Sequence, residues 1–225
     1  MKKIFTLIAV AAMAMSVNAQ RIAFTAADAA TAGTLDGKVF EAGNFKITLT
    51  DTGAKMVIDE NAQWFGTADA QEKSAGARLK SGGKSSSKNL ITVSAPSTGV
   101  LKIWARTGSG SVTDRNLVLT QNETELYNKV LLESDAVKVV GLDDSDPTKE
   151  TSVFPIISVE VAAGDVVVTY PVGSVNFYCF EFVDPASVKT INANAQNTAT
   201  YNLAGQKVAD DYKGMVIKNG KKMMK

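Results

Sequence analysis

The chain consists largely of short segments in which apolar and polar residues alternate, separated by turns rich in Gly, Pro and Asp. Alternation with a period of two places successive side chains on opposite faces of a β-strand. No stretch keeps the 3.6-residue period of an amphipathic helix. The pattern predicts an all-β fold, an antiparallel β-sandwich of the jelly-roll type. The expected strands cover residues 45–50, 55–59, 89–93, 100–106, 116–120, 125–130, 136–140, 156–161, 165–170 and 174–183.

The last three of these strands are joined by short turns, Ala163-Gly164 and Pro171-Val172-Gly173. Such turns favour hairpins, so the three strands are expected to form a meander. The final strand is apolar on both faces, which predicts a central strand covered on both sides. Strict alternation would place Tyr178, Phe180 and Phe182 on one face, and Phe177 with Cys179, an inert buried thiol, on the other.

The N-terminus reads as an export signal. Lys2 and Lys3 precede an apolar run, residues 4–15, that is too short to span a bilayer comfortably, and small residues precede a cleavage point after Ala19. Residues 1–19 are therefore expected to be a signal peptide, and the mature chain to begin at Gln20, secreted or on the outer cell surface. No second long apolar run follows, so no transmembrane segment is expected.

The remaining chain suggests three parts. Residues 20–184 carry the strands of the sandwich module, and a Ser-, Gly- and Lys-rich stretch at 71–88 predicts a long exposed loop with a short strand inside it. Residues 185–199 are rich in Ala, Asn and Thr and suit a linker. Residues 200–225 contain alternating apolar residues around an Asn-Gly turn, which predicts a short C-terminal β-hairpin tail.

Charge and composition restrict the function. The 24 Lys and Arg nearly balance the 23 Asp and Glu, so nothing indicates electrostatic capture of nucleic acid. The chain contains no histidine, which removes Ser-His-Asp and Cys-His catalysis and histidine metal sites. Carboxylate pairs or Lys and Arg bases remain, but none stands at a convincing spacing. The single cysteine cannot form an intrachain disulfide.

One expected strand, 100–106, combines an aromatic residue with two cations on a single face. Lys102, Trp104 and Arg106 alternate with the apolar residues of the opposite face. Sugar rings stack on indole, and their hydroxyls and carboxylates accept hydrogen bonds from Lys and Arg. These residues are therefore candidate ligand contacts. The alternative is that Trp104 packs under a loop while the cations are merely solvated.

Further candidate contacts lie in two loops. Arg115 ends a small-residue loop beside Asp114, which can orient its guanidinium toward a ligand. Arg78 and Lys80 share one face of the short strand within the long loop, and with Trp64 upstream they form a second aromatic and cationic group. The alternatives are a structural ion pair at Arg115 and a mobile basic loop over a buried Trp64.

A compact acidic stretch contains Asp143, Asp144 and Asp146. Oxygen ligands at this density are compatible with a structural Ca²⁺, although the spacing is not that of an EF-hand. The alternative is a solvated acidic turn that needs no metal. No other cofactor is expected.

The segments "RLKSGG" (78–83), "LKIWARTGSGSVTDRNLVL" (101–119) and "GDVVVTYPVGSVNFYCFEF" (164–182) resemble a non-catalytic β-sandwich module of secreted proteins from gut anaerobes. Such modules accompany pectate lyases and other polysaccharide-degrading enzymes. The resemblance implies a carbohydrate-binding jelly roll that recognises a plant-type polysaccharide, pectin or hemicellulose.

The end of the chain, "YNLAGQKV" (201–208) followed by "DYKGMVIKNGKKMMK" (211–225), resembles the end of the C-terminal sorting domain of type IX secretion. This implies a contact with the secretion machinery. The sequence thus favours an exported carbohydrate-binding module that is not an enzyme. A structural or adhesive surface protein that binds a protein partner, and a small polysaccharide lyase or esterase, are the alternatives.

Overall fold

The computed structural model describes residues 19–184 and, nearer the C-terminus, 200–202, 207–208, 213, 215–218 and 221–224. The chain divides into two compact units, residues 1–188 and 189–225. The expected signal peptide, apart from Ala19, and the expected linker 185–199 lie outside the described residues. Within the described part, no helix has the length and apolar character needed to span a membrane.

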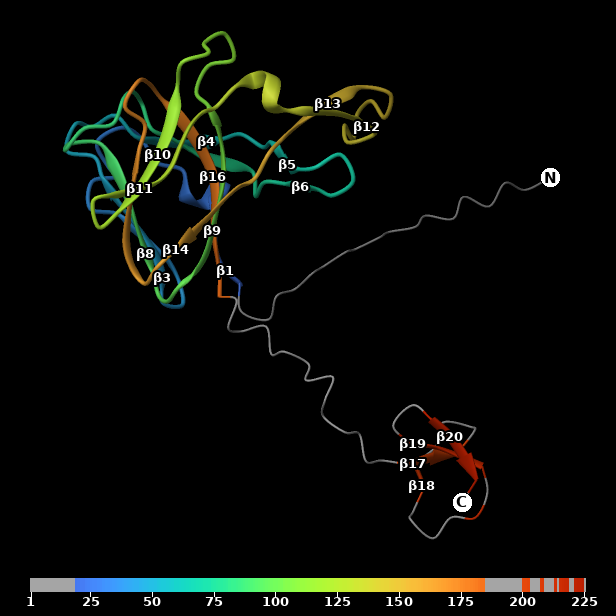
Figure 1. The fold of residues 1–225 in the computed structure, drawn as a ribbon. Coiled ribbons are helices and arrows are strands. Elements are labelled where there is room, and N and C mark those ends of the chain that lie inside the picture. The colour runs from blue at the N-terminus through green and yellow to red at the C-terminus, as the bar shows by residue number, and fades with distance from the viewer. Residues whose placement is uncertain are drawn as a thin grey trace. The chain divides into compact units, whose positions relative to one another are not determined.

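Two six-stranded sheets form the sandwich of the larger unit (Figure 1). In the first, sheet A, the strand order is β14-β9-β16-β7-β4, and β1 pairs with another part of β16. The strands of sheet A are β1 (Ala19–Ala23), β4 (Val57–Glu60), β7 (Ala77–Lys80), β9 (Gly99–Thr107), β14 (Ile157–Val161) and β16 (Val175–Val183).

Sheet B faces sheet A and has the order β11-β10-β15-β8-β3-β2. All its pairings are antiparallel. Its strands are β2 (Val39–Ala42), β3 (Phe45–Thr50), β8 (Leu90–Ala95), β10 (Asn116–Gln121), β11 (Thr124–Val130) and β15 (Gly164–Thr169).

A small four-stranded sheet, sheet C, has the order β12-β13-β5-β6 and projects from the sandwich (Figure 1). Only the pairing of β13 with β5 is parallel among its described strands. Sheet C contains β5 (Trp64–Gly66), β6 (Gln71–Lys73), β12 (Val137–Val140) and β13 (Glu150–Phe154). Two single-turn 3-10 helices, η1 (Ala26–Asp28) and η2 (Glu133–Asp135), complete the unit.

The all-β prediction is confirmed. Each expected strand is present, with ends that differ by one or two residues, and the expected short strand inside the long loop is β7. The strand expected at 136–140 is β12, which belongs to sheet C and not to the sandwich. The strands that the sequence did not indicate are the short β1, β2, β5, β6 and β13. The jelly-roll connectivity stays a prediction.

The expected meander of the last three strands is wrong. β14 and β16 both pair with β9 in sheet A, whereas β15 lies between β8 and β10 in sheet B. The short connections between them therefore cross from one sheet to the other. A turn signal shows where the chain reverses, but the pairing partners are strands distant in sequence, which local residues do not specify.

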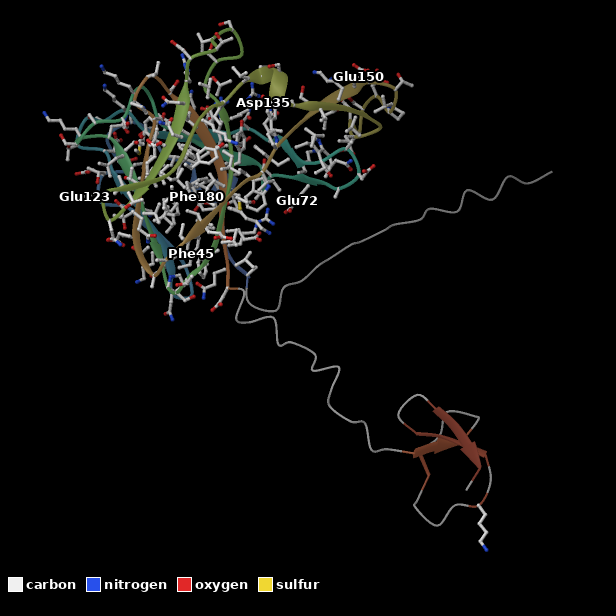
Figure 2. The ribbon with its side chains drawn as sticks, in the orientation of Figure 1. Phe45, Glu72, Glu123, Asp135, Glu150 and Phe180 are labelled. Carbon is white, nitrogen blue, oxygen red and sulfur yellow. The ribbon has the colours of Figure 1, made fainter. Side chains whose placement is uncertain are left out.

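The interior between sheets A and B is filled by alternating apolar side chains from both. Figure 2 shows Phe45 and Phe180 inside it, while Glu72 and Glu150 lie out on strands of sheet C. Phe180 stacks on Phe177 at a centroid distance of 5.6 Å and meets Phe24 edge-on at 6.5 Å. The close packing of these rings makes the interior sensitive to truncation.

Strand β16 is buried on both faces, as predicted, but one face assignment is wrong. Phe177, Phe180 and Phe182 belong to the core between the sheets, whereas Tyr178 and Cys179 lie together on the outer face. The reason is a bulge between Phe177 and Cys179, which breaks the alternation along the strand.

The smaller unit contains one antiparallel four-stranded sheet with the order β18-β17-β19-β20. Its strands are β17 (Thr200–Asn202), β18 (Lys207–Val208), β19 (Met215–Lys218) and β20 (Lys221–Met224). β19 and β20 form the expected hairpin, with Lys218 opposite Lys221.

Replacing Phe180 with Ala should lower the free energy of unfolding by about 3–5 kcal/mol, because it leaves a cavity in a fully buried core. The measurement is urea unfolding followed by circular dichroism. Val140→Ala is the control, because this valine is 58% exposed and its truncation should cost under about 0.5 kcal/mol. A loss below 1 kcal/mol for Phe180→Ala would contradict this core.

Candidate functional site

Trp104 lies on the outer face of sheet A, as its strand alternation predicts, but its ring is covered. The side chain is 2% exposed and packs with Phe65 and Phe154 of sheet C. The Arg21 guanidinium lies 4.7 Å from the ring centroid. Trp104 therefore offers no open face for stacking, because sheet C occupies the place that a ligand would need.

The two cations on the same strand are held by carboxylates. Arg106 donates from Nη2 to Glu133 Oε2 at 2.8 Å, and its guanidinium lies 4.6 Å from the Phe154 ring centroid. Lys102 donates to Glu181 Oε1 at 3.2 Å. Both expected contacts are thus engaged within the protein.

Arg78 and Lys80 share one carboxylate on the neighbouring strand. Arg78 Nε donates to Asp59 Oδ1 at 2.8 Å, and Lys80 Nζ lies 3.4 Å from Asp59 Oδ2. Burial favours the neutral acid, but hydrogen bonds and charge from Arg78 and Lys80 outweigh it and hold the pKa of Asp59 below its usual value.

The structure brings two of the candidate ligand contacts, Arg106 and Lys80, close to each other. Asn176 of β16 is the register partner of Arg106 on one side and of Lys80 on the other. Arg106 and Lys80 therefore flank one asparagine on the outer face of sheet A.

Arg115 has a structural contact at the end of β9. Its Nη1 donates to the Ser174 carbonyl at 3.1 Å and to Ser174 Oγ at 2.7 Å. The guanidinium lies against Gly108 and Gly173, where a Cβ would approach it to 2.9 Å. Arg115 thus joins two loops, and small residues are needed beside it.

Trp64 differs from Trp104 because its ring borders an open cleft of about 380 Å³ on sheet C. It is half-buried, while its neighbour Phe65 points the other way and is fully buried in the cluster with Trp104. Lys73 Nζ lies 5.7 Å from the Trp64 ring centroid and 3.4 Å from Asp144 Oδ2. This "Trp64 cleft" is lined by Ala62, Gln63, Trp64, Lys73, Leu142, Asp143, Asp144, Ser145 and Thr151.

The acidic stretch that borders this cleft is organised by its own hydrogen bonds. Asp143 Oδ1 accepts from the Ser145 backbone at 2.9 Å and from Ser145 Oγ at 2.6 Å, and Asp143 Oδ2 accepts from Lys149 at 2.7 Å. The Lys149 bond, followed by those from Ser145, lowers the pKa of Asp143 well below its usual range. Asp146 likewise accepts from Thr148 through Oδ1.

These contacts do not gather the carboxylates of Asp143, Asp144 and Asp146, the candidate calcium ligands of the sequence, around one point. The carboxylates of Asp143 and Asp146 turn to their own loop, and the Asp144 side chain is 93% exposed. Across the described residues, no group of three or more acidic or thiol side chains is placed to hold a metal ion.

A larger cleft of about 620 Å³, the "edge cleft", lies beside β11 and β14, the outermost strands of sheets B and A. Its walls are mainly apolar, with Arg106, Tyr127, Lys129, Asp135 and Ser158 as charged or polar groups. Burial, assisted by the negative charge of Asp135, raises the pKa of Tyr127. The apolar lining comprises Val130, Leu131, Leu132, Phe154, Pro155, Ile156 and Ile157.

Sequence reasoning found Trp64 and the acidic stretch but did not connect them. It missed Gln63, Lys73 and Thr151 of the Trp64 cleft, and of the edge cleft it singled out Arg106 alone. Gln63, Lys73 and Thr151 lie on or beside short strands that carry too few residues to show a period. No protein-family model matches this chain, and the search of curated proteins gives no match.

Cys179 should stay unreactive in the folded protein. Burial raises the pKa of its thiol to about 12, and Arg21 Nε donates to Sγ at 3.2 Å without reversing this effect. Only a small fraction is thiolate at pH 8, and the sulfur is covered. A chromogenic disulfide reagent should label the native protein slowly or not at all, and one thiol per chain in guanidinium chloride. Stoichiometric labelling of the native protein within minutes at pH 8 would contradict this burial.

Proposed function

We propose that this chain is an exported, non-catalytic carbohydrate-binding protein that holds a polysaccharide at the Trp64 cleft. The observation that carries the proposal is an accessible indole among convergent polar side chains. Pyranose rings present C–H faces that stack on indole, and their hydroxyls both donate and accept hydrogen bonds. A site of this kind needs one aromatic platform and a few well-placed polar groups.

The polar groups of the Trp64 cleft suit sugar hydroxyls. Gln63 supplies an amide donor and acceptor, Thr151 and Ser145 supply hydroxyls, and Asp144 supplies an exposed carboxylate acceptor. The bonds within the Asp143 loop hold Ser145 in place before any ligand arrives. Less ordering of this loop is then needed on binding.

Lys73 lies over the Trp64 ring and competes with a stacking ligand for it. At an exposed site, a cation over indole is worth about 0.5–1 kcal/mol, and its pairing with Asp144 at 3.4 Å is exposed and weak. A sugar displaces Lys73 at small cost. The displaced ammonium is then solvated.

The other parts of the proposal rest on sequence. The signal-peptide pattern at 1–19 supports export, and the likeness of 201–225 to a sorting domain supports a contact with secretion machinery and display at the cell surface. The lack of histidine supports a non-catalytic role, because imidazole acid–base chemistry is missing from this chain. A plant-type polysaccharide, pectin or hemicellulose, is the proposed ligand class.

Trp64→Ala should weaken polysaccharide binding by about 30-fold or more, the ~2 kcal/mol expected of a central aromatic anchor. The measurement is affinity electrophoresis of the chain on xylan and methyl-esterified pectin. Trp104→Phe is the matched control, because it changes the buried indole and should leave binding within about twofold. Lys73→Ala should strengthen binding, since it frees the ring. Equal retardation of wild type and Trp64→Ala on every polymer would contradict the proposal.

A second candidate function is a structural or adhesive surface protein that binds a protein partner. The buried position of Trp104 and the mainly apolar edge cleft, beside which Val130 is 41% exposed, favour it. The same experiment separates the two functions. The adhesive role predicts that the wild-type chain is retarded by none of the polysaccharides.

A further inference from the structure

Three lysines at one end of sheet A form an exposed group without ion pairs. Lys55 lies in the connection from β3 to β4, and Lys84 and Lys88 lie in the connection from β7 to β8. All three side chains are exposed, and within the described residues none makes a salt bridge. We call Lys55, Lys84 and Lys88 the lysine pad.

The two loops that carry the pad are packed together. Gly53 donates its backbone N–H to the Lys88 carbonyl at 3.2 Å. Gly82 has a φ of +68°, and a Cβ there would collide with the Lys55 carbonyl, so only glycine fits. A Cβ on Gly83 would lie 3.9 Å from Lys55 Nζ, which places this ammonium next to the segment that carries Lys84.

A buried polar network fixes the longer loop. Tyr170 donates from its hydroxyl to Asn89 Oδ1 at 2.8 Å, and Asn89 Nδ2 donates to the Ser81 carbonyl at 2.9 Å. Ser81 Oγ accepts from the Val175 backbone at 2.9 Å, and Ser85 Oγ accepts from the Tyr170 backbone at 2.9 Å. Burial, with the nearby charge of Asp51, raises the pKa of Tyr170, so it remains a neutral donor. The loop that was expected to be exposed is thus anchored at both ends.

The acidic groups nearby do not face the pad. Asp51 is 1% exposed, and its two carboxylate oxygens accept from the backbones of Lys55 at 2.8 Å and Met56 at 3.0 Å. Asp59 is shared by Arg78 and Lys80. Asp36, which is exposed, accepts from the Asp51 backbone through Oδ1 at 2.9 Å. These carboxylates are therefore engaged within the protein, whereas the three lysines are exposed and make no salt bridge within the described residues.

We propose that the lysine pad is a second binding site, for a polysaccharide that carries closely spaced carboxylates. Three ammonium groups on a rigid base match a row of oxyanions, with little side-chain ordering beyond the lysines themselves. The surrounding residues are Gly and Ser, which let a polymer approach the backbone closely. The pad carries no aromatic ring for base stacking, which favours a polyuronate over single-stranded nucleic acid. This site is independent of the Trp64 cleft and does not need the proposed stacking interaction.

The test compares two triple variants of the whole chain. K55Q/K84Q/K88Q removes the pad, and K38Q/K46Q/K138Q removes the same charge from other surface positions. Polygalacturonate is the probe, titrated at several salt concentrations. The pad variant should bind at least 10-fold more weakly at low salt, and the control within about twofold. Wild-type binding should weaken as salt rises, because exposed charges are screened. A variant with Arg in place of all three pad lysines should bind polygalacturonate as wild type does, because it keeps the positive charge.

Several results would overturn the proposal. They are equal binding by the pad variant and wild type, equal binding of the fully methyl-esterified polymer, and tighter binding of single- or double-stranded DNA. Sulfated dextran serves as the other polyanion, and a preference for it over polygalacturonate would reject a carboxylate ligand. A different result would show that the Trp64 cleft does not bind polysaccharide. Trp64→Ala would then bind neutral xylan as tightly as wild type does, while the effect of the pad variant on polygalacturonate binding would be unchanged.

Discussion

Strand β16 is the element on which the rest of the larger unit depends, because it is buried on both faces. On one face, Phe177, Phe180 and Phe182 join the core against sheet B. On the other, Tyr178 and Cys179 join a second cluster against sheet C. The bulge between Phe177 and Cys179 makes this division possible, since it delivers two consecutive side chains to the outer face. The strand also pairs with β1, β7 and β9, so it links both packed layers.

Sheet C, which packs on the outer face of sheet A, determines which tryptophan is exposed. Trp104 pairs with Cys179 across the sheet and is covered by Phe65 and Phe154. The residue next to Phe65 in the same short strand is Trp64, which alternation directs away from the cluster. Strand β5 therefore covers the indole of Trp104 with Phe65 and directs the indole of Trp64 to the other side. The carbohydrate site that we propose therefore lies on sheet C, and not on the strand that carries Lys102, Trp104 and Arg106.

The sequence predicted what local patterns determine. Alternation located the strands of both large sheets except the short β1 and β2, and the apolar character of 176–182 indicated a strand buried on both sides. It did not predict which sheet β15 enters, because pairing depends on strands far away in the chain. It left Trp104 open between a ligand contact and a residue packed under a loop, because a polar strand face in sequence does not reveal a third layer packed on it. The basic stretch 71–88 was expected to be a long exposed loop because Ser, Gly and Lys favour loops, yet Ser81 and Asn89 anchor it in the interior. Trp64 and the acidic stretch were each noticed, but their proximity depends on the pairing of β5 with β13.

The most direct test asks which indole senses a bound polysaccharide. Two variants with a single tryptophan are needed, Trp104→Phe, which keeps Trp64, and Trp64→Phe, which keeps Trp104. Tryptophan fluorescence is then recorded during titration with xylan. The account predicts a saturable change in intensity and emission wavelength for the protein that keeps Trp64, and none for the protein that keeps only the buried Trp104. A saturable change carried by Trp104, with Trp64 silent, would contradict the assignment of the site to sheet C.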